Sequence, residues 1–417
     1  MDSLKLDTTR LLRDIDTLAT FTEPGCEGWT RRAFSPAFID GRAWLAAQMR
    51  EAGLAVATDP AGNLIGRCAG TAARAPLVIG SHTDTVPGAG RFDGMLGVLA
   101  GLSVARALDA AGLYLRHPLE IVDFLAEEPT PFGVSCIGSM GLVGALDTAA
   151  LDRRDWEGRT LADALSSVGG SPAALSTAAR RPGEVAAYLE LHIEQGRVLE
   201  TAGVALGAVQ GIVGIRRVDL RLVGRPDHAG TTPMAFRHDA LAAAAETVLA
   251  AERAAQATPG SVATVGVARV SPNQGNVVPG VVHLSAEMRS LDWPAVKQLW
   301  NTVEAATWAA CAARGVTLEI VGVEDAAPMH TPDWLVQIIA AICADLAPGA
   351  PTLPSGAGHD AMWMGRIAPS GMIFVRCRDG RSHCPEEYAA PEDIAAGVTA
   401  LARTLLTLDE RLDQAHT

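Results

Sequence analysis

The chain has 417 residues, of which 48% are hydrophobic and 19% are charged, and its formal net charge is −13 at pH 7. These values are typical of a globular protein of two or three domains, and they exclude a disordered, collagen-like or coiled-coil chain. The acidic charge is spread without a basic stripe, which argues against a nucleic acid as a partner.

The N-terminal segment, residues 1–21, alternates charged and apolar residues at helical spacing and lacks the apolar core of a signal peptide. We therefore expect a cytoplasmic protein that does not bind a membrane. The longest uncharged stretch, residues 129–146, contains two prolines and four glycines, which predicts a loop leading into a core segment. The seven cysteines show no CxxC spacing, so neither a disulfide framework nor a thiolate zinc site is expected.

Three short apolar runs predict strands, and each run ends at polar side chains. The runs are residues 76–81, 119–125 and 185–192, which lead to His82, to the pair Glu127 and Glu128, and to His192. A helical pattern that begins at Gly94 separates the first two runs. Alternating strands and helices of this kind are typical of an open α/β sheet, whose site lies at the carboxyl ends of the strands.

The pattern changes between residues 215 and 323. Strand-like segments and helices alternate there as 215–224, 239–256 (helix), 262–270, 281–288, 294–314 (helix) and 316–322. The order β-α-β-β-α-β indicates a ferredoxin-like inserted domain. After Asp325 the chain returns to a helix (334–346), a strand (371–377) and a terminal helix from Pro391. We therefore predict a discontinuous α/β domain (1–213 and 326–417), with an open mixed sheet and helices on both faces, and an inserted domain (214–325).

Five motifs carry residue types that suit a metal site. They are SHTDTVPGAGRFDG (81–94), EEPTPFG (127–133), ELHIEQG (190–196), GRPDHAGTTPM (224–234) and GRSHCPEE (380–387). A single His beside an acid is more often a structural pair than a metal ligand. Together, however, the motifs place three His and two acids at strand ends or in loops, where a divalent cation with nitrogen and oxygen ligands needs them. The five candidates are His82, Asp93, Glu128, His192 and His383.

These motifs, with QGNVVPG, AEMRS and GAGHDA in the same order, make the sequence resemble the M20-type zinc amidohydrolases. The likeness covers essentially the whole chain and is specific to the hydantoinase/carbamoylase branch. It implies hydrolysis of the carbamoyl C–N bond of an N-carbamoyl-L-amino acid to the amino acid, ammonia and carbon dioxide. The alternatives are an allantoate amidohydrolase or a β-ureidopropionase, then an M20-type dipeptidase or aminoacylase. A non-catalytic protein that binds carboxylates is the alternative from another class.

The resemblance also implies two divalent metal ions per subunit. Zinc is favoured, and manganese, cobalt or nickel are alternatives, because all of them accept imidazole and carboxylate ligands. Asp93 would bridge the two ions. His82 and His192 would complete the ligands of one ion, and Glu128 and His383 those of the other. A pair of ions about 3.5–4 Å apart can lower the pKa of a water molecule from about 15.7 towards 7.

Two further acids are expected beside these ligands. Glu127 would be the general base that takes a proton from the attacking water and passes it to the leaving nitrogen. Adjacent residues of a strand point to opposite faces, so Glu127 and Glu128 serve one site only if the chain turns there, as Pro129 favours. Asp84 would accept the second ring N–H of His82 and so fix its tautomer. For Asp84, an acid in a surface turn is the alternative.

The same resemblance assigns residues to a small substrate that carries a carboxylate. Arg289 would bind the carboxylate with its planar guanidinium, and a simple pair with a nearby acid is the alternative for this arginine. Gln195, Asn276 and Gly358 would contact the substrate. His228 would stabilise the developing oxyanion. Because His228, Asn276 and Arg289 belong to the inserted domain, the resemblance implies that this domain closes during catalysis. It also implies a homodimer formed through the inserted domain, since an edge strand of that domain offers a surface for pairing.

The sequence departs from the family pattern at three places near these motifs, of which one is Arg225-Pro226-Asp227 before His228. Pro-Thr-Pro-Phe follows Glu127 and Glu128 where many relatives have Gly-Ser-Arg-Phe, which removes a positive charge and is expected to change the pocket. Arg376 and Arg378 precede the motif of His383. They either line the cleft for an additional acidic group of the substrate or face solvent at a strand end.

Overall fold

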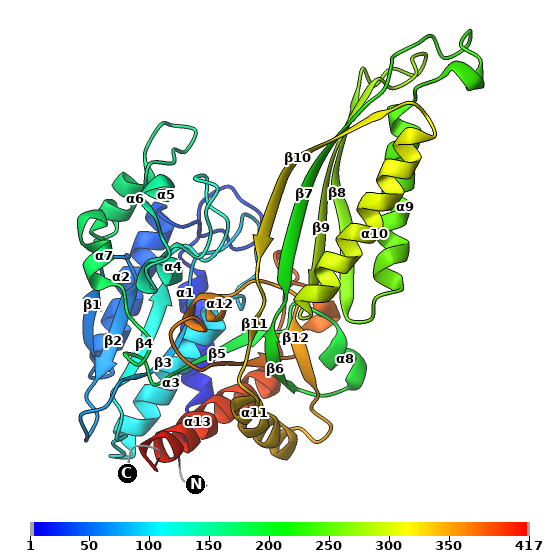
Figure 1. Ribbon diagram of the computed structural model, residues 1–417. Helices are drawn as coiled ribbons and strands as arrows, with labels where there is room; N and C mark the ends of the chain where they lie inside the picture. The colour runs from blue at the N-terminus through cyan, green and yellow to red at the C-terminus, as the bar shows by residue number, and fades with distance from the viewer. Residues whose placement is uncertain (1–3, 415–417) are drawn as a thin grey trace. The chain divides into compact units, whose positions relative to one another are not determined.

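The computed structural model describes residues 4–414, and the chain divides into two compact units (Figure 1). The first unit consists of the residues up to Gln210 together with those from Thr331 onward, and the second is Gly211–His330. From the sequence we had placed these boundaries after residues 213 and 325. Among the described residues, no helix is long and apolar enough to cross a membrane. All seven cysteines are free.

A nine-stranded mixed sheet forms the centre of the first unit. The strand order is β1-β2-β4-β3-β5-β13-β6-β11, and β12 also pairs with β6. In that order the strands are Ala55–Thr58, Leu64–Cys68, Leu119–Phe124, Leu77–His82, Ala187–Ile193, Ser370–Val375, Leu206–Ile212 and Met329–His330, with β12 at Thr352–Ser355. The four central strands, β4, β3, β5 and β13, are parallel, so their carboxyl ends meet at one edge.

Every residue of these four parallel strands is buried. Near-continuous burial of this kind arises when helices cover both faces of a parallel sheet, and it explains why the strands read as unbroken apolar runs in the sequence. The prediction of an open mixed α/β sheet is confirmed. The helices of the first unit are α1 Thr8–Ala19, α2 Pro36–Glu51, α3 Met95–Ala110, α4 Ile137–Leu142, α5 Thr148–Leu151, α6 Leu161–Ser167, α7 Leu175–Ala178, α8 Val198–Ala202, α11 Asp333–Leu346, α12 Ala361–Met364 and α13 Pro391–Gln414.

The second unit has the predicted order β-α-β-β-α-β. Its elements are β7 Gly214–Val223, α9 Ala240–Gln256, β8 Ser261–Ser271, β9 Val281–Ser290, α10 Trp293–Ala312 and β10 Thr317–Ala326. The strands form an antiparallel sheet in the order β10-β7-β9-β8 (Figure 1). Alternate residues of β9, such as Leu284 and Met288, are buried in the same core as residues of α9 and α10. Asp239 and Asp292 cap the N-termini of the two helices, because each carboxylate accepts a backbone N–H of the first turn.

Candidate metal centre

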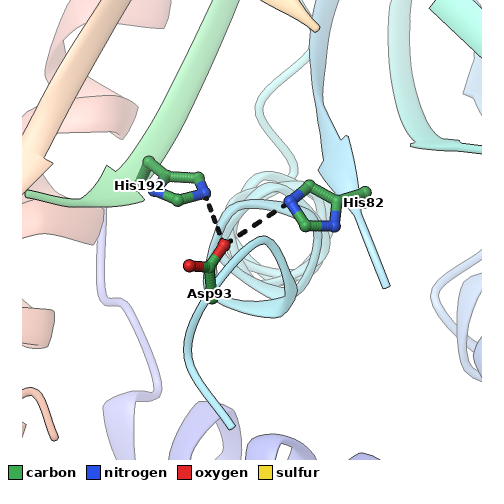
Figure 2. A group of neighbouring side chains, drawn as sticks. All are labelled: His82, Asp93 and His192. Carbon is green, nitrogen blue, oxygen red and sulfur yellow. Dashed lines mark ion pairs between the residues drawn. The ribbon is translucent and has the colours of Figure 1, made fainter. Parts of the chain in front are cut away.

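The parallel strands bring five of the sequence candidates to one edge of the first unit. His82 is the last residue of β3, His192 lies near the end of β5, and Glu128 follows β4. Asp93 lies just before α3, and His383 lies in the loop between β13 and α13. Figure 2 shows the Asp93 carboxylate pointing between the rings of His82 and His192. Strand order and direction therefore explain why residues up to about 300 positions apart in the chain converge here.

The five side chains form two groups that share Asp93. Asp93 Oδ1 lies 3.2 Å from His192 Nε2 and 3.6 Å from His82 Nε2. The second oxygen, Oδ2, lies 3.4 Å from His383 Nε2, which in turn lies 3.2 Å from Glu128 Oε1. One carboxylate thus presents a different oxygen to each group of potential ligands.

The spacing of these atoms fits the binding of divalent cations. Two donors that each lie about 2.0–2.1 Å from one tetrahedral zinc ion are about 3.3–3.4 Å apart. The observed separations between neighbouring donors are 3.2–3.6 Å. The donor set of imidazole nitrogens and carboxylate oxygens also suits Zn²⁺ or Mn²⁺. His82, Asp93, Glu128 and His192 are buried, whereas the His383 side chain is 46% exposed, which leaves the centre accessible.

A glycine next to Asp93 makes this close packing possible. Gly94 has a φ of +70°, and a Cβ atom placed on it would lie 2.4 Å from the His82 ring. Its backbone N–H also donates to His192 Nε2 at 3.2 Å. Both the backbone conformation and the lack of space therefore require glycine at this position.

Neighbouring charges lower the pKa of Asp93 and raise the pKa values of His192 and His383. Burial would raise the pKa of Asp93, but the neighbouring His192, His383 and His82 outweigh it and hold that pKa well below its usual range. Hydrogen bonds to Asp93 and Glu128 raise the pKa of His383 to about 11. Burial lowers the pKa of His192, yet the Asp93 carboxylate reverses this and raises it to about 9. A cation held by these side chains would have to displace such protons.

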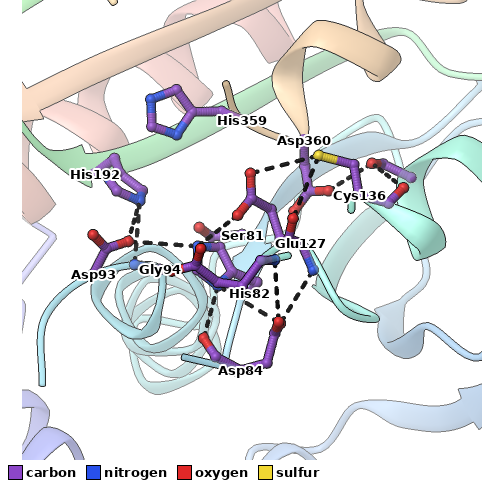
Figure 3. Close-up of polar contacts among 12 residues, drawn as sticks. Ser81, His82, Asp84, Asp93, Gly94, Glu127, Cys136, His192, His359 and Asp360 are labelled. Carbon is purple, nitrogen blue, oxygen red and sulfur yellow. Dashed lines mark hydrogen bonds and ion pairs between the residues drawn. The ribbon is translucent and has the colours of Figure 1, made fainter. Parts of the chain in front are cut away.

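Asp84 contacts the cluster differently from the sequence prediction (Figure 3). We expected its carboxylate to accept the second ring N–H of His82. Instead His82 Nδ1 lies 3.0 Å from the main-chain carbonyl oxygen of Asp84 and 3.7 Å from its carboxylate. The carboxylate accepts the backbone N–H groups of Glu127 and Glu128 at 3.2 and 3.1 Å. Asp84 therefore fixes the turn that follows β4, and burial raises its pKa to about 7.

This turn brings both glutamates to the same centre. It begins at Ala126, whose φ is +52°, one residue before Glu127 and three before Pro129, where we had expected it. Glu127 Oε2 lies 3.6 Å from His82 Nε2, and its other oxygen, Oε1, lies 3.5 Å from the Cys136 thiol. Burial, and next the charge of Glu128, raise the pKa of Glu127 well above its usual value. A carboxyl group with these neighbours is suited to accepting protons.

Sequence reasoning missed two side chains, Glu387 and Ser382, that hold Asp93 in place. The buried Glu387 accepts the backbone N–H of Phe92 at 2.8 Å and that of Asp93 at 3.0 Å. Ser382 Oγ donates to Asp93 Oδ2 and lies 3.1 Å from Glu387 Oε2. Glu387 stands four residues after His383 in the motif GRSHCPEE, so its position in that motif was the available signal.

Removal of the Glu387 carboxylate is expected to weaken metal binding. The variant Glu387→Ala should lose about 10- to 100-fold in metal affinity, because residues that orient a ligand typically contribute this much. Glu387→Gln retains an acceptor oxygen and should lose less. Metal content after dialysis against buffers of graded free Zn²⁺ or Mn²⁺ measures both. The matched control is Glu386→Ala, which removes an exposed neighbour; equal affinities for the two alanine variants would contradict this role.

Two of the predicted substrate residues also lie in the first unit. Gln195 donates from Nε2 to Asp93 Oδ2 at 2.6 Å, and its buried Oε1 has no hydrogen-bond partner among the described residues. Gly358 lies in the loop after β12, where a Cβ would meet no atom within 4 Å. A cavity of about 450 Å³ is lined by Gln195, Ser382 and His383, among others. The side-chain oxygen Oε1 of Gln195 is therefore available to accept a hydrogen bond beside the centre.

The other three predicted substrate residues, His228, Asn276 and Arg289, lie in the second unit. His228 Nδ1 accepts the backbone N–H groups of Gly230 at 3.0 Å and Thr231 at 3.2 Å, so the ring proton is on Nε2. The backbone carbonyl of Asn276 accepts the N–H of Ala229 at 2.9 Å, which places the two segments side by side. Arg289 lies on β9, and its Nε donates to Glu287 at 2.5 Å.

In the structure Arg376 and Arg378 each contact a side chain of the chain itself. Arg376 donates to both carboxylate oxygens of Asp393 at 2.9 and 3.1 Å, and the Arg378 guanidinium lies 4.6 Å from the centre of the Tyr388 ring. Neither lines the cavity that contains His383. Arg376 therefore holds the first turn of α13 by an ion pair with Asp393.

Comparisons with known proteins agree with this architecture. Residues 78–407 match the family described as peptidase family M20/M25/M40. The chain is 42% identical over 382 residues to the N-carbamoyl-L-amino acid amidohydrolase of Geobacillus stearothermophilus, which covers 91% of this chain and 93% of that protein. It is 34% identical over 416 residues to the ureidoglycolate hydrolase of Arabidopsis thaliana, covering 97% and 87%. The crystal structure of a hydantoinase/carbamoylase-family amidase from Burkholderia multivorans superimposes with a TM-score of 0.89 at 34% identity, covering 97% and 98%.

Proposed function

The chain belongs to peptidase family M20/M25/M40, in its hydantoinase/carbamoylase branch, and from this we propose that it hydrolyses the carbamoyl C–N bond of an N-carbamoyl-L-amino acid. The products are the free L-amino acid, ammonia and carbon dioxide. The observation that carries the proposal is the Asp93 carboxylate between two groups of ligand-type side chains, with Glu127 beside one of them. The relatives named N-carbamoyl-L-amino acid amidohydrolase support this substrate over other ureides.

Two divalent cations would be held by these residues. Asp93 would contribute one oxygen to each cation, His82 and His192 would complete the ligands of the first, and Glu128 and His383 those of the second. When bound, such a pair of cations polarises the ureido carbonyl and makes a water molecule acidic near neutral pH. The short donor separations support this assignment. Zinc is the favoured ion, and manganese, cobalt and nickel suit the same donors.

Glu127 would perform the proton transfers. Its carboxylate would accept a proton from the attacking water and deliver it to the nitrogen that leaves. The position of Oε2 beside His82 supports this role, because the carboxylate is next to the proposed ligands. Asp84 would hold Glu127 in place through the backbone N–H groups of the turn.

Residues of the second unit would bind the rest of the substrate. Arg289 would pair with the carboxylate, and His228 would donate its Nε2 proton to the developing oxyanion. The hydrogen bonds that leave Nδ1 as an acceptor support the role of His228. Asn276, Gln195 and Gly358 would contact the remaining polar groups.

We further propose that the protein forms a homodimer through the second unit. One of its two edge strands, β8, offers backbone groups for pairing, and Val262 and Val267 on this strand are 59% and 40% exposed. Apolar side chains on an edge strand are typical of surfaces that a second chain covers. A monomer mass in sedimentation at micromolar protein concentration would contradict the dimer.

A turnover panel tests the proposed activity. The substrates are N-carbamoyl-L-amino acids, ureidoglycolate, allantoate, N-carbamoyl-β-alanine and a dipeptide, each assayed with added manganese, cobalt or zinc. An N-carbamoyl-L-amino acid should give the highest kcat/KM. A chelator should abolish this turnover, and added metal should restore it. Higher kcat/KM for allantoate or ureidoglycolate would replace the proposed substrate, and chelator-resistant turnover would contradict the metal centre.

A further inference from the structure

A second cavity in the first unit adjoins the proposed metal ligands. It has a volume of about 310 Å³, and Glu128 and Asp84 form part of its wall. Small-ligand sites occupy about 300–1,000 Å³, so this cavity is large enough for one substituent of a substrate. Because Glu128 belongs both to this wall and to the proposed cation centre, the cavity lies next to that centre.

The remaining wall is mostly apolar. Ala33, Pro87, Pro129 and Pro131 contribute aliphatic surface, and Trp156, whose side chain is 80% exposed, lies at the rim. The prolines limit backbone freedom on this side of the cavity. The loop is also fixed by the Thr130 hydroxyl, which donates to the Val134 carbonyl at 2.6 Å. We call this cavity the Trp156 pocket.

The charges around the Trp156 pocket disfavour an anionic group. Of the described residues that line it, Arg32 is the one cation, and its guanidinium binds the carboxylate of Glu23 through Nε at 3.0 Å and Nη2 at 2.5 Å. Asp84 and Glu128 add carboxyl groups on the inner side. A second carboxylate of a substrate would therefore lose its hydration without gaining an unpaired cation, whereas an apolar group gains free energy on leaving water.

We propose that the Trp156 pocket binds the side chain of the N-carbamoyl-L-amino acid and selects uncharged, apolar side chains. The inference rests on the proposed function, since it concerns the part of the same substrate that does not react. It assigns a role in specificity to Trp156 and to the segment 129–131, where the sequence departs from the family pattern by its Pro-Thr-Pro.

The test compares kcat/KM for N-carbamoyl-L-leucine, N-carbamoylglycine and N-carbamoyl-L-aspartate with the full-length, metal-loaded protein. The kcat/KM for N-carbamoyl-L-leucine should be at least about tenfold higher than that for N-carbamoylglycine and about 100-fold higher than that for N-carbamoyl-L-aspartate. Differences of this size are typical of hydrophobic pockets. Trp156→Ala should lower the ratio of leucine to glycine at least about fivefold. Trp156→Arg places a cation at the rim and should raise the ratio of aspartate to leucine about tenfold.

The matched control is Tyr114→Ala, which removes an aromatic side chain that is 73% exposed and lies outside this cavity. It should leave both ratios as in the unmodified protein. If the unmodified protein hydrolyses the three substrates equally well, or if the ratios do not change in the Trp156 variants, the pocket assignment is wrong while the proposed function stands. If none of the three substrates is hydrolysed, the proposed function itself fails, and the pocket assignment fails with it.

Discussion

Replacement of Glu127 by Gln should lower kcat about 10²- to 10⁴-fold, which is the usual contribution of a positioned general acid or base. The amide has nearly the same shape as the carboxylate but cannot accept the proton of the attacking water. The backbone of the turn, which Asp84 holds through the N–H groups of Glu127 and Glu128, is unchanged by this substitution. Steady-state kinetics with the best N-carbamoyl-L-amino acid measures the effect.

A measurement of metal content distinguishes the loss of the general base from the loss of the metal centre. Because Glu127 is not among the five proposed ligands, Glu127→Gln should retain the metal content of the unmodified protein. Glu386→Gln, which changes an exposed glutamate, is the control for the chemical change and should retain full activity. A Glu127→Gln variant with near-normal kcat would remove this residue from the mechanism.

Replacement of Asp93 by Ala should empty the whole centre, because Asp93 is the residue that both groups of potential ligands share. The metal content should fall from about two ions per subunit to nearly none, and kcat/KM should fall at least about 10³-fold, since bound cations contribute several kcal/mol to such reactions. His192→Ala, which changes one group alone, should retain about one ion. Elemental analysis after dialysis measures both variants.

The fold of the Asp93 variant must be checked separately, because four of the five proposed ligands are buried. Circular dichroism and thermal unfolding of Asp93→Ala should match those of the unmodified protein after metal removal. Retention of one tightly bound ion in a folded Asp93→Ala protein would show that the two groups are independent and that Asp93 does not bridge them.

The sequence predicted the elements that position the ligands because their signals are local. The apolar run 76–81 became β3, Leu77–His82, and the run 185–192 became β5, Ala187–Ile193, with a histidine at or near each carboxyl end. The inserted β-α-β-β-α-β order was equally readable, since alternation in strands such as β9 and helical spacing in α9 and α10 are properties of short segments.

Contacts between segments that are distant in the chain could not be predicted from local sequence patterns. The hydrogen bond from the Asp93 backbone to Glu387 joins residues 294 positions apart, and no local pattern encodes it. The role of Asp84 was wrong in detail for a related reason. Its main-chain carbonyl, which every residue type possesses, occupies the position next to His82 that we had given to its side chain. The turn at Ala126 depends on a positive φ, which the presence of an alanine in the sequence does not predict.

The tight approach of Gly94 to His82 restricts how this centre can be re-engineered. A library that randomises residues around Asp93 will recover only glycine at position 94, since every other amino acid carries a carbon atom that overlaps the imidazole. Designers who wish to change the preferred cation would have to vary the ligands themselves, of which His383 is the most exposed. At position 94, the backbone conformation and the adjacent imidazole together require glycine.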